Sequence, residues 1–313
     1  MKHKSGETNP GKEGWFKDKG ASDDKGNAFC LKCGAWKGSL GLEPNMELYI
    51  KHLCDIFDEC KRVLREDGTC WVNLGDTYWG GGNNRGSSPE NLSTKQFSNR
   101  GARGQVQNKW DNSYPSKSLC LIPFRFAIEM VNRGWTIRNT VIWQKLNAMP
   151  SSVKDRFTVD FEYLFFLTKN KKYYFEQQFE NLAENTLKRT KYSNSLQNKM
   201  ASKQYSINLE SYDKYADKVQ KGILNGRNKR CVWTIPTKPF SGSHFAVYPP
   251  ELIRTCIQAG CPKNGIVLDP FAGSGTTGEE AVRQGKNYIL IELNPEYIKL
   301  IKKRLEGIQV KLL

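Results

Sequence analysis

The sequence predicts an α/β fold whose carboxyl-terminal part is a parallel, doubly wound sheet. From residue 249 onward, short apolar runs alternate with segments of helical periodicity. Strands separated by helices in this way form parallel sheets, because an antiparallel pair needs no helical crossover. The expected order is a helix at 249–259, a strand at 266–268, a helix at 276–284, a strand at 288–291 and a helix at 295–305.

The middle of the chain is expected to add two helices and three strands. Apolar residues recur at helical spacing after Met46, and Glu66-Asp67-Gly68 ends that pattern with turn residues. The short apolar run that follows suits a buried strand, and two later runs suit a hairpin joined through residues 145–158. The expected elements are helices at Met46–Arg65 and Leu119–Asn132 and strands at Thr69–Leu74, Trp135–Trp143 and Asp160–Thr168.

The composition is typical of a soluble globular protein, with 38% hydrophobic and 26% charged residues in a chain of 313. No apolar run approaches the roughly 18 residues of a membrane span, and the polar start of the chain does not resemble a signal peptide. The formal net charge of +16 predicts a polyanionic partner, either nucleic acid or an acidic membrane surface. Charge alone leaves open a basic protein without such a partner.

Nine cysteines without an export signal indicate a reducing compartment in which the thiols stay free. Cys30 and Cys33 have the spacing of half a zinc site. Cys54 and Cys60 fall in a helical pattern and offer no matching pair. We therefore expect no bound metal.

Polar and basic stretches interrupt the periodic segments. Residues 1–40 are rich in glycine and lysine and are expected to form an amino-terminal tail. Residues 83–118 show no apolar periodicity, and a loop of that length is either functional or disordered. Residues 181–230 carry eleven lysine and arginine residues against four acidic ones, interleaved with tyrosines. This pattern suits a nucleic-acid groove and equally a solvated basic face. We expect one folded domain, 41–180 with 231–313, and 181–230 as an insert.

A glycine-rich turn, DPFAGSGTT, begins at Asp269 and connects the strand at 266–268 to the next helix. Such sheets bind ligands at the carboxyl ends of strands, and Gly273 and Gly275 permit a close approach of the backbone. The turn lacks the third glycine of a dinucleotide fingerprint and the lysine of a phosphate-binding loop. Glu292, at the end of the next strand, can accept both ribose hydroxyls, and Asp269 can meet an ammonium group. A ribose and an ammonium group without a pyrophosphate describe S-adenosylmethionine.

Four segments extend this argument over most of residues 40–305. They are LGLEPNMELYIKHLCDIFDECKRVLREDGTCWVNLGDTY, GWTIRNTVIWQKLNAMPSSVKDRFTVDFEYLFFLTKNKKYYF, VWTIPTKPFSGSHFAVYPPELI, and VLDPFAGSGTT with YILIELNPEYIKLIKKRL. In this order they resemble the bacterial and phage DNA amino-methyltransferases, which modify adenine N6 or cytosine N4. The resemblance implies a Rossmann-like methyltransferase sheet, mostly parallel with an antiparallel hairpin edge. It also implies a circularly permuted motif order, with the catalytic half before the cofactor half.

The same resemblance implies a cofactor site. Phe245 is expected either to pack on the methionine portion of the cofactor or to be an ordinary core aromatic residue. The other residues expected to hold S-adenosylmethionine are Asp269, Phe271, Gly273, Ser274, Gly275 and Glu292.

The catalytic tetrapeptide of the family is absent from this sequence. That tetrapeptide, Asp/Ser/Asn-Pro-Pro-Tyr/Phe, binds the amine of a base that has left the duplex, where its target atom is inaccessible. Tyr248-Pro249-Pro250 has the wrong order. Three explanations are open: a separate segment or chain supplies the motif, the chain is inactive, or Gly75–Tyr78 takes over part of its role. Asp76 and Tyr78 are therefore the catalytic candidates.

Candidate DNA contacts come from two regions. Lys145 and Arg156 match family segments that face the catalytic cleft, although Asp155 and Arg156 could equally form a structural ion pair. The basic insert contributes Arg227, Lys229 and Arg230. Cytosine C5 methylation is disfavoured, because its nucleophile lies in a Pro-Cys dipeptide that this sequence lacks. RNA methylation is disfavoured by the lack of a recognisable RNA-binding module.

The resulting hypothesis is a site-specific DNA methyltransferase of a restriction–modification system. It would transfer a methyl group from S-adenosylmethionine to an exocyclic amine in double-stranded DNA, in the cytoplasm of a bacterial or phage-infected cell. The alternative is an inactive or split relative that binds DNA and cofactor without turnover.

Overall fold

The computed structural model describes residues 29–30, 32–79, 114–182, 217–218, 226–238 and 247–308. The chain divides into two compact units, one of Met1–Leu53 with Arg85–Asp111 and one of Cys54–Asn84 with Asn112–Leu313. Most of the expected tail, the expected loop at 83–118 and the interior of the expected insert lie outside the described residues. The proposed domain division therefore stays a prediction.

The first unit contains a short turn and the start of a helix. Phe29 and Trp36 form an antiparallel bridge, and the ring of Trp36 stacks on His52 with 5.6 Å between ring centroids. Nδ1 of His52 lies 3.0 Å from Oε1 of Glu43, whose side chain is almost fully buried. His52 belongs to α1 (Met46–Val63), which continues into the second unit at Cys54.

The second unit is built on a four-stranded sheet with the order β1-β3-β2-β6. β3 pairs antiparallel with both of its neighbours, and β6 pairs parallel with β2. Leu74 lies opposite Tyr163 and Gln144 opposite Phe161, so β1 and β2 end where β3 begins. We call this edge of the sheet the Leu74 end. The strands are β1 (Thr69–Leu74), β2 (Thr136–Gln144), β3 (Phe161–Thr168) and β6 (Val232–Thr234).

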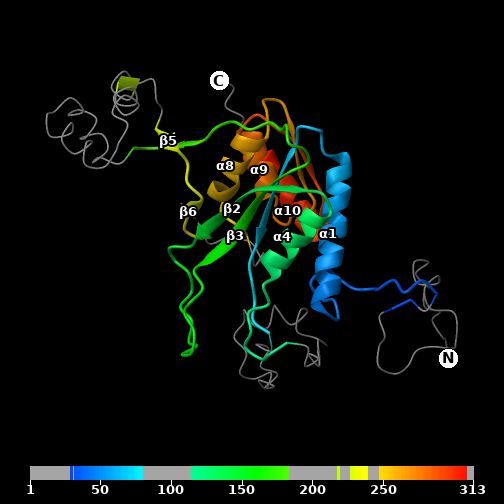
Figure 1. The fold of residues 1–313 in the computed structure, drawn as a ribbon. Helices are drawn as coiled ribbons and strands as arrows, with labels where there is room; N and C mark the ends of the chain where they lie inside the picture. Colours follow the sequence, from blue (N-terminus) through cyan, green and yellow to red (C-terminus); the bar gives the residue numbers. More distant parts are fainter. Residues whose placement is uncertain are drawn as a thin grey trace, which may run out of the picture. The chain divides into compact units, whose positions relative to one another are not determined.

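Helices cover both faces of this sheet because alternate side chains of its strands are apolar on each face (Figure 1). On one face, Leu164 of β3 belongs to a buried cluster with Leu252 and Cys256 of α8 (Pro250–Gly260). The next residue, Phe165, points the other way and lies 6.2 Å from Phe126 of α4 (Ile122–Asn132), measured between ring centroids. Burying a phenylalanine such as Phe126 completely stabilises the fold by about 1.5–3 kcal/mol.

The carboxyl-terminal part alternates strictly between strands and helices, as the sequence predicts. β7 (Ile266–Asp269) and β8 (Asn287–Leu290) pair in parallel, and α9 (Thr276–Arg283) connects them. α10 (Pro295–Glu306) follows, capped by the Asn294 side chain, which accepts a hydrogen bond from the Glu296 amide at 3.0 Å. These elements run from orange to red in Figure 1.

Two features differ from expectation. α4 begins at Ile122 rather than Leu119, because Pro123 occupies its first turn and Leu121 adopts a left-handed conformation with φ of 58°. The β2–β3 hairpin lies inside the four-stranded sheet rather than at an edge, because β1 pairs antiparallel with β3. The described sheet is therefore mixed rather than mostly parallel.

A short ladder holds the two ends of the basic insert together. β4 (Phe179–Glu180) pairs antiparallel with β5 (Arg227–Asn228). Gly226 precedes β5 with φ of 126°, and a Cβ atom there would meet the Glu180 carbonyl oxygen at 2.3 Å, so only glycine fits. In the part of the chain that the structure describes, no helix has the length and apolar character needed to cross a membrane.

Candidate functional site

The glycine turn extends the pairing of β7 and β8 before the chain enters α9. The Ile291 amide donates to the Asp269 carbonyl at 2.9 Å, and the Ala272 amide donates to the Ile291 carbonyl at 3.0 Å. The Gly275 amide then donates back to the Ala272 carbonyl at 2.7 Å, and Gly275 has φ of +82°. A Cβ atom on Gly275 would lie 3.0 Å from Ile301 of α10. Both conformation and space therefore call for glycine at this position.

Arg304 of α10 holds the same turn from behind. Its Nη1 atom donates to the Ser274 carbonyl, to the Ser274 hydroxyl and to the Thr276 hydroxyl, each at 3.1 Å. Its Nε atom donates to Glu279 of α9. Ser274 is only 3% exposed. Its role in the structure is thus to hold the turn to α10, while it also lines the cavity described below.

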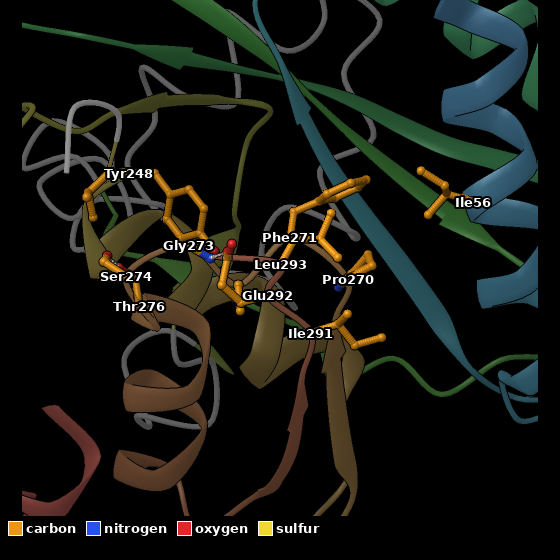
Figure 2. Close-up of a pocket in the computed structure, with 12 residues that line it drawn as sticks. Ile56, Tyr248, Pro270, Phe271, Gly273, Ser274, Thr276, Ile291, Glu292 and Leu293 are labelled. Atoms are coloured by element: carbon orange, nitrogen blue, oxygen red, sulfur yellow. Dashed lines mark hydrogen bonds between the residues drawn. The ribbon is translucent and has the colours of Figure 1, made fainter. Parts of the chain in front are cut away.

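Glu292 spans the turn from the end of β8. One carboxylate oxygen accepts a hydrogen bond from the Gly273 amide at 2.8 Å, and the other accepts one from the Asn294 amide at 2.8 Å. Figure 2 shows Glu292 pointing toward Gly273, with Tyr248 and Phe271 on either side. A carboxylate offers about four acceptor positions. Glu292 therefore retains capacity for two hydroxyl donors such as those of a ribose.

A cavity of about 510 Å³ opens beside Glu292. Apolar side chains surround it, and three of them are exposed to solvent, Leu293 almost fully and Phe271 and Ile291 by about half. Ile56 of α1 lies on the same cavity (Figure 2). Exposed apolar groups around one carboxylate suit a ligand with a flat apolar ring and a diol, as in an adenosine. The residues present therefore fit S-adenosylmethionine.

Asp269 is occupied by donors from the protein. Oδ1 accepts a hydrogen bond from the Phe271 amide at 2.9 Å. Oδ2 accepts hydrogen bonds from the Thr277 hydroxyl and from the Tyr248 hydroxyl, the latter at 3.3 Å. Tyr248 is partly buried, and burial of its hydroxyl together with the Asp269 charge raises its pKa far above the ordinary range, so the hydroxyl stays a donor. Of the predicted cofactor residues that the structure describes, Phe271, Gly273, Ser274 and Glu292 line the cavity. Asp269 and Gly275 do not.

The predicted contact of Asp269 with an ammonium group therefore stays a prediction, and the structure gives this residue a supporting position. Phe245, the remaining candidate, lies outside the described residues. Thr277 and Arg304 were not expected to support the site, and nothing distinguishes Arg304 from the other cations of its helix. Tyr248 belongs to the stretch from His244 to Pro249, which resembles the family's additional cofactor-side motif.

Asp76 follows β1 at the Leu74 end of the sheet. Its Oδ1 atom accepts hydrogen bonds from the Thr77 amide at 2.8 Å and from the Ile122 amide, at the start of α4, at 3.1 Å. Its Oδ2 atom is buried and has no hydrogen-bond partner among the described residues. Buried carboxylate oxygens are normally satisfied, and an unsatisfied one marks a possible binding group. Asp76 therefore combines a structural oxygen with a buried, unsatisfied acceptor.

The ring of Tyr78 lies beside a cation. The guanidinium carbon of Arg156 is 3.6 Å from the centroid of the Tyr78 ring, within the range of a cation–π contact. Asp155 does not pair with Arg156 in the described contacts and instead accepts a hydrogen bond from Lys117 at 2.7 Å. The alternative of an Asp155–Arg156 ion pair is thus not observed.

The aromatic residues between the two sites form a continuous contact. The ring of Phe271 lies 6.3 Å from Phe57, and Phe57 lies 5.4 Å from Phe126 of α4, both between centroids. The first residue of α4, Ile122, is the one that binds Asp76. The glycine turn and Asp76 are therefore joined through α4, which carries Phe126 and begins at Ile122.

The other DNA-binding candidates occupy two separate places. Lys145 continues from β2 at the Leu74 end, where it is paired with Glu162 and lies over the Trp143 ring at 4.7 Å. Arg227 and Arg230 both donate to Oε1 of Glu180 at 2.6 Å. Burial acts to raise the pKa of Glu180, but these hydrogen bonds outweigh it and lower the pKa.

Lys229 lies over the Trp233 ring at 5.4 Å, just before β6. β6 pairs only with the last residues of β2. The residues before it consequently lie alongside the middle of β2, away from Lys145. The structure brings Lys145 and Arg156 together with the Asp76 region and sets Arg227, Lys229 and Arg230 apart.

The cysteine pair forms a tight turn in the first unit. The Cys30 amide donates to the Ala35 carbonyl at 2.7 Å, and the Gly34 amide donates to the Cys30 carbonyl at 2.8 Å. Backbone hydrogen bonds from Cys33 and Lys32 lower the pKa of the Cys30 thiol. Within the described ranges, no three histidine, cysteine or acidic side chains gather as a metal site.

Comparison with known proteins agrees with a protein that binds S-adenosylmethionine at this site. A family model described as DNA methylase matches residues 15–303. The chain is 39% identical to the Type II methyltransferase M.Cfr9I of Citrobacter freundii, covering 86% of this chain and 75% of that protein. It is 36% identical to the Type II methyltransferase M.SmaI of Serratia marcescens, covering 86% and 77% respectively. The chain belongs to the DNA methylase family, and S-adenosylmethionine is its cofactor.

A solved structure shows the same fold. The PvuII DNA methyltransferase (cytosine-N4-specific) superimposes with a TM-score of 0.53 at 16% identity, covering 86% of this chain and 73% of the other. At that identity the likeness shows a shared methyltransferase fold and no shared specificity.

Proposed function

We propose that the chain transfers a methyl group from S-adenosylmethionine to an exocyclic amine of adenine or cytosine in double-stranded DNA. Membership of the DNA methylase family supports the reaction class. The observation that carries the assignment to this chain is the carboxylate of Glu292, held 2.8 Å from the Gly273 amide at the mouth of an apolar cavity. This arrangement offers acceptors for a ribose beside a surface for an adenine ring.

In this proposal, Glu292 binds the ribose hydroxyls, and Phe271, Ile291 and Leu293 contact the adenine. Gly273 and Ser274 bring the backbone against the ligand, while Asp269 and Gly275 fix the shape of the turn. S-adenosylmethionine supplies an electrophilic methyl group on its sulfonium ion. The chain's own residues must then exclude water and orient the amine that receives it.

Asp76 is the group that we assign to the amine. The nitrogen lone pair of an exocyclic amine is delocalised into the ring, and an acceptor for an N–H of the amine favours a more tetrahedral nitrogen. Oδ2 of Asp76 is such an acceptor, because it is buried and unpaired while Oδ1 is fixed by Thr77 and Ile122. Tyr78, two residues on, offers a ring face for the flipped base.

A second candidate function is binding of DNA and cofactor without turnover. One observation favours it: the sequence contains no Pro-Pro-Tyr or Pro-Pro-Phe tripeptide. In this case the chain is either inactive or split from a segment or chain that supplies the missing group, and Asp76 acts only through α4. The two candidates share the cofactor site and differ in the role of the Oδ2 atom.

The Asp76→Asn variant separates these candidates. Asparagine keeps the oxygen that binds Thr77 and Ile122, and it replaces the unpaired oxygen with an amide NH₂ that cannot accept a hydrogen bond. We expect transfer of tritiated methyl groups to unmethylated bacterial duplex DNA to fall by about 100-fold or more, with the melting temperature and calorimetric cofactor affinity unchanged.

The matched control is Glu47→Gln, which also replaces a carboxylate with an amide, in the first turn of α1. If the wild type incorporates methyl groups and Asp76→Asn incorporates them equally well, Asp76 has a structural role alone. Cofactor and DNA binding by the wild type with no incorporation would establish the second candidate.

A further inference from the structure

The loop between β2 and β3, residues 145–160, exposes apolar side chains to solvent. Phe157 is 96% exposed and Met149 is 88% exposed, and every residue from 151 to 159 is exposed to solvent. Figure 1 shows this loop, in green, extending beyond β2 and β3. Apolar groups gathered on an exposed projection usually mark a binding surface.

The loop is anchored at its base. The Lys145 amide donates to the Asp160 carbonyl at 2.7 Å, which closes the two ends of the loop. The Asn147 side chain donates to the Thr237 carbonyl at 2.9 Å and accepts from the Thr237 amide at 2.8 Å. The exposed side chains are therefore carried on a backbone that is held next to β6.

The loop also contacts the site end of the sheet. The guanidinium carbon of Arg156 lies 3.6 Å from the centroid of the Tyr78 ring. Tyr78 is two residues after Asp76. Lys117, which precedes α4, binds Asp155 at 2.7 Å. Phe157 immediately follows these two anchored residues. Its ring consequently projects from the loop close to the place where the proposed function puts the flipped base.

The charge of the loop favours a polyanion. Lys154 and Arg156 are exposed, and Lys117 neutralises Asp155 through a hydrogen bond that lowers the pKa of that carboxyl. Cations beside an apolar ring match a nucleic acid, whose phosphates are anionic and whose base faces are apolar. DNA-binding proteins that distort the duplex commonly insert phenylalanine or methionine between base steps.

We propose that Phe157 enters the base stack of duplex DNA and fills the gap that the flipped base leaves. This inference rests on the proposed function, because it needs a base to be extruded. Flipping a base breaks its stacking and pairing, and an aromatic ring in the gap restores part of the lost contact. Arg156 and Lys154 then hold the neighbouring phosphates.

The test compares two DNA probes with the full chain. One is a fluorescein-labelled pool of 30-base-pair duplexes of randomised sequence, and the other is the same pool with one central abasic site. We expect the wild type to bind the abasic pool several-fold more tightly, because the gap is already open. Phe157→Ala should reduce this preference to near unity while changing affinity for the intact pool by less than about twofold, since stacking contributes roughly tenfold per base.

Two further variants keep the test specific. Phe157→Trp should retain the preference, because indole stacks as well as phenyl. Ile128→Ala removes an apolar side chain that is 64% exposed on α4, and it should behave as wild type. An equal preference in Phe157→Ala and wild type, or no preference in wild type, overturns the proposal.

Two other occupants of the loop are separate outcomes. If Phe157→Ala keeps the DNA preference but loses a dimer that the wild type shows in sedimentation, the ring serves self-association. If it keeps the DNA preference but loses binding to phosphatidylglycerol vesicles, the ring serves a membrane. Either result would overturn the proposal. A wild type that transfers no methyl group yet shows a Phe157-dependent preference would contradict the proposed function and support this inference.

Discussion

The carboxylate of Glu292 binds two backbone N–H groups of its own protein, and in the proposed function it also binds the ribose. Glu292→Gln replaces one acceptor oxygen with a donor that faces a backbone N–H. We expect the calorimetric affinity for S-adenosylmethionine to fall about 10- to 100-fold, because hydrogen bonds to charged groups contribute about 1.5–3 kcal/mol.

The matched control for this prediction is Glu296→Gln. Glu296 is exposed on α10 and pairs with Lys299 at 2.8 Å, away from the cavity. Equal affinities in wild type and Glu292→Gln would remove Glu292 from the cofactor site and leave it a role in the turn only.

At the level of single residues, sequence reasoning identifies the atoms that can bind but not their partners. Asp269 and Glu292 are both recognisable as carboxylates at strand ends, yet Asp269 is occupied by Tyr248 and Thr277 whereas Glu292 lines the cavity. The contact between Asp76 and Ile122 joins residues far apart in the chain, and no local pattern indicates it.

The glycine turn packs against α10. Comparing Gly275 with Gly285 distinguishes the effect of backbone conformation from the effect of contact with that helix. Gly275 and Gly285 both have positive φ, but a Cβ atom on Gly275 would press on Ile301, whereas one on Gly285 meets nothing within 4 Å. We expect Gly285→Ala to lower the free energy of unfolding by about 1 kcal/mol through backbone strain, and Gly275→Ala to lower it by more.

Urea unfolding of both variants measures the difference. An equal loss in the two proteins would show that α10 yields to the added methyl group at no cost. A smaller loss in Gly275→Ala would contradict the contact with Ile301.

α9 and α10 are also joined by charge. Burial acts to raise the pKa of the Glu279 carboxyl, but hydrogen bonds from Arg283 and Arg304 outweigh burial and lower it. A carboxyl with a lowered pKa stabilises the fold above its unfolded pKa, about 4.3, and this contribution is lost as the pH falls through the folded value. We therefore expect the free energy of unfolding to decrease below about pH 4.5, and to decrease less in Glu279→Gln.

Urea unfolding at neutral pH and across the acid range checks this prediction. The control is Glu296→Gln, which makes the same charge change at an exposed position in the first turn of α10. If Glu279→Gln follows the same pH dependence as wild type, the two arginines do not stabilise the folded state through Glu279.

At the level of elements, the apolar pattern is sufficient to locate helices and strands. β1 has the predicted bounds, Thr69–Leu74, because all six of its residues pair with β3. The pattern does not determine which strands pair. A strand paired on both sides and one paired on a single side have the same apolar residues, and so the central position of β3 is visible only in three dimensions.

For the whole molecule, the net charge of +16 divides into groups with different environments. Arg156 and Lys154 lie on the exposed loop, whereas Arg227 and Arg230 share the carboxylate of Glu180. Removing a phosphate-contacting cation reduces the slope of log affinity against log salt by about one. We expect this change for Lys154→Ala in duplex DNA binding.

Arg230→Ala tests the same salt dependence for a cation that is paired with Glu180. Since Arg230 partly neutralises Glu180 within the protein, we expect its loss to change the salt slope by clearly less than the loss of Lys154. Fluorescence anisotropy between 50 and 300 mM salt, roughly the range over which such slopes are resolved, measures both. A larger change for Arg230→Ala would place the principal phosphate contacts at the β4–β5 ladder.

The ring of Tyr78 already has a flat partner in the absence of DNA. The guanidinium of Arg156 lies at the distance at which a nucleobase would stack on that ring. In the proposed function, a base that stacks on this face of the ring exchanges with Arg156, and the displaced cation then becomes available to the DNA backbone. Under that proposal Arg156 both competes with the base and contacts its phosphate, so that affinity and rate need not change in the same direction when it is replaced.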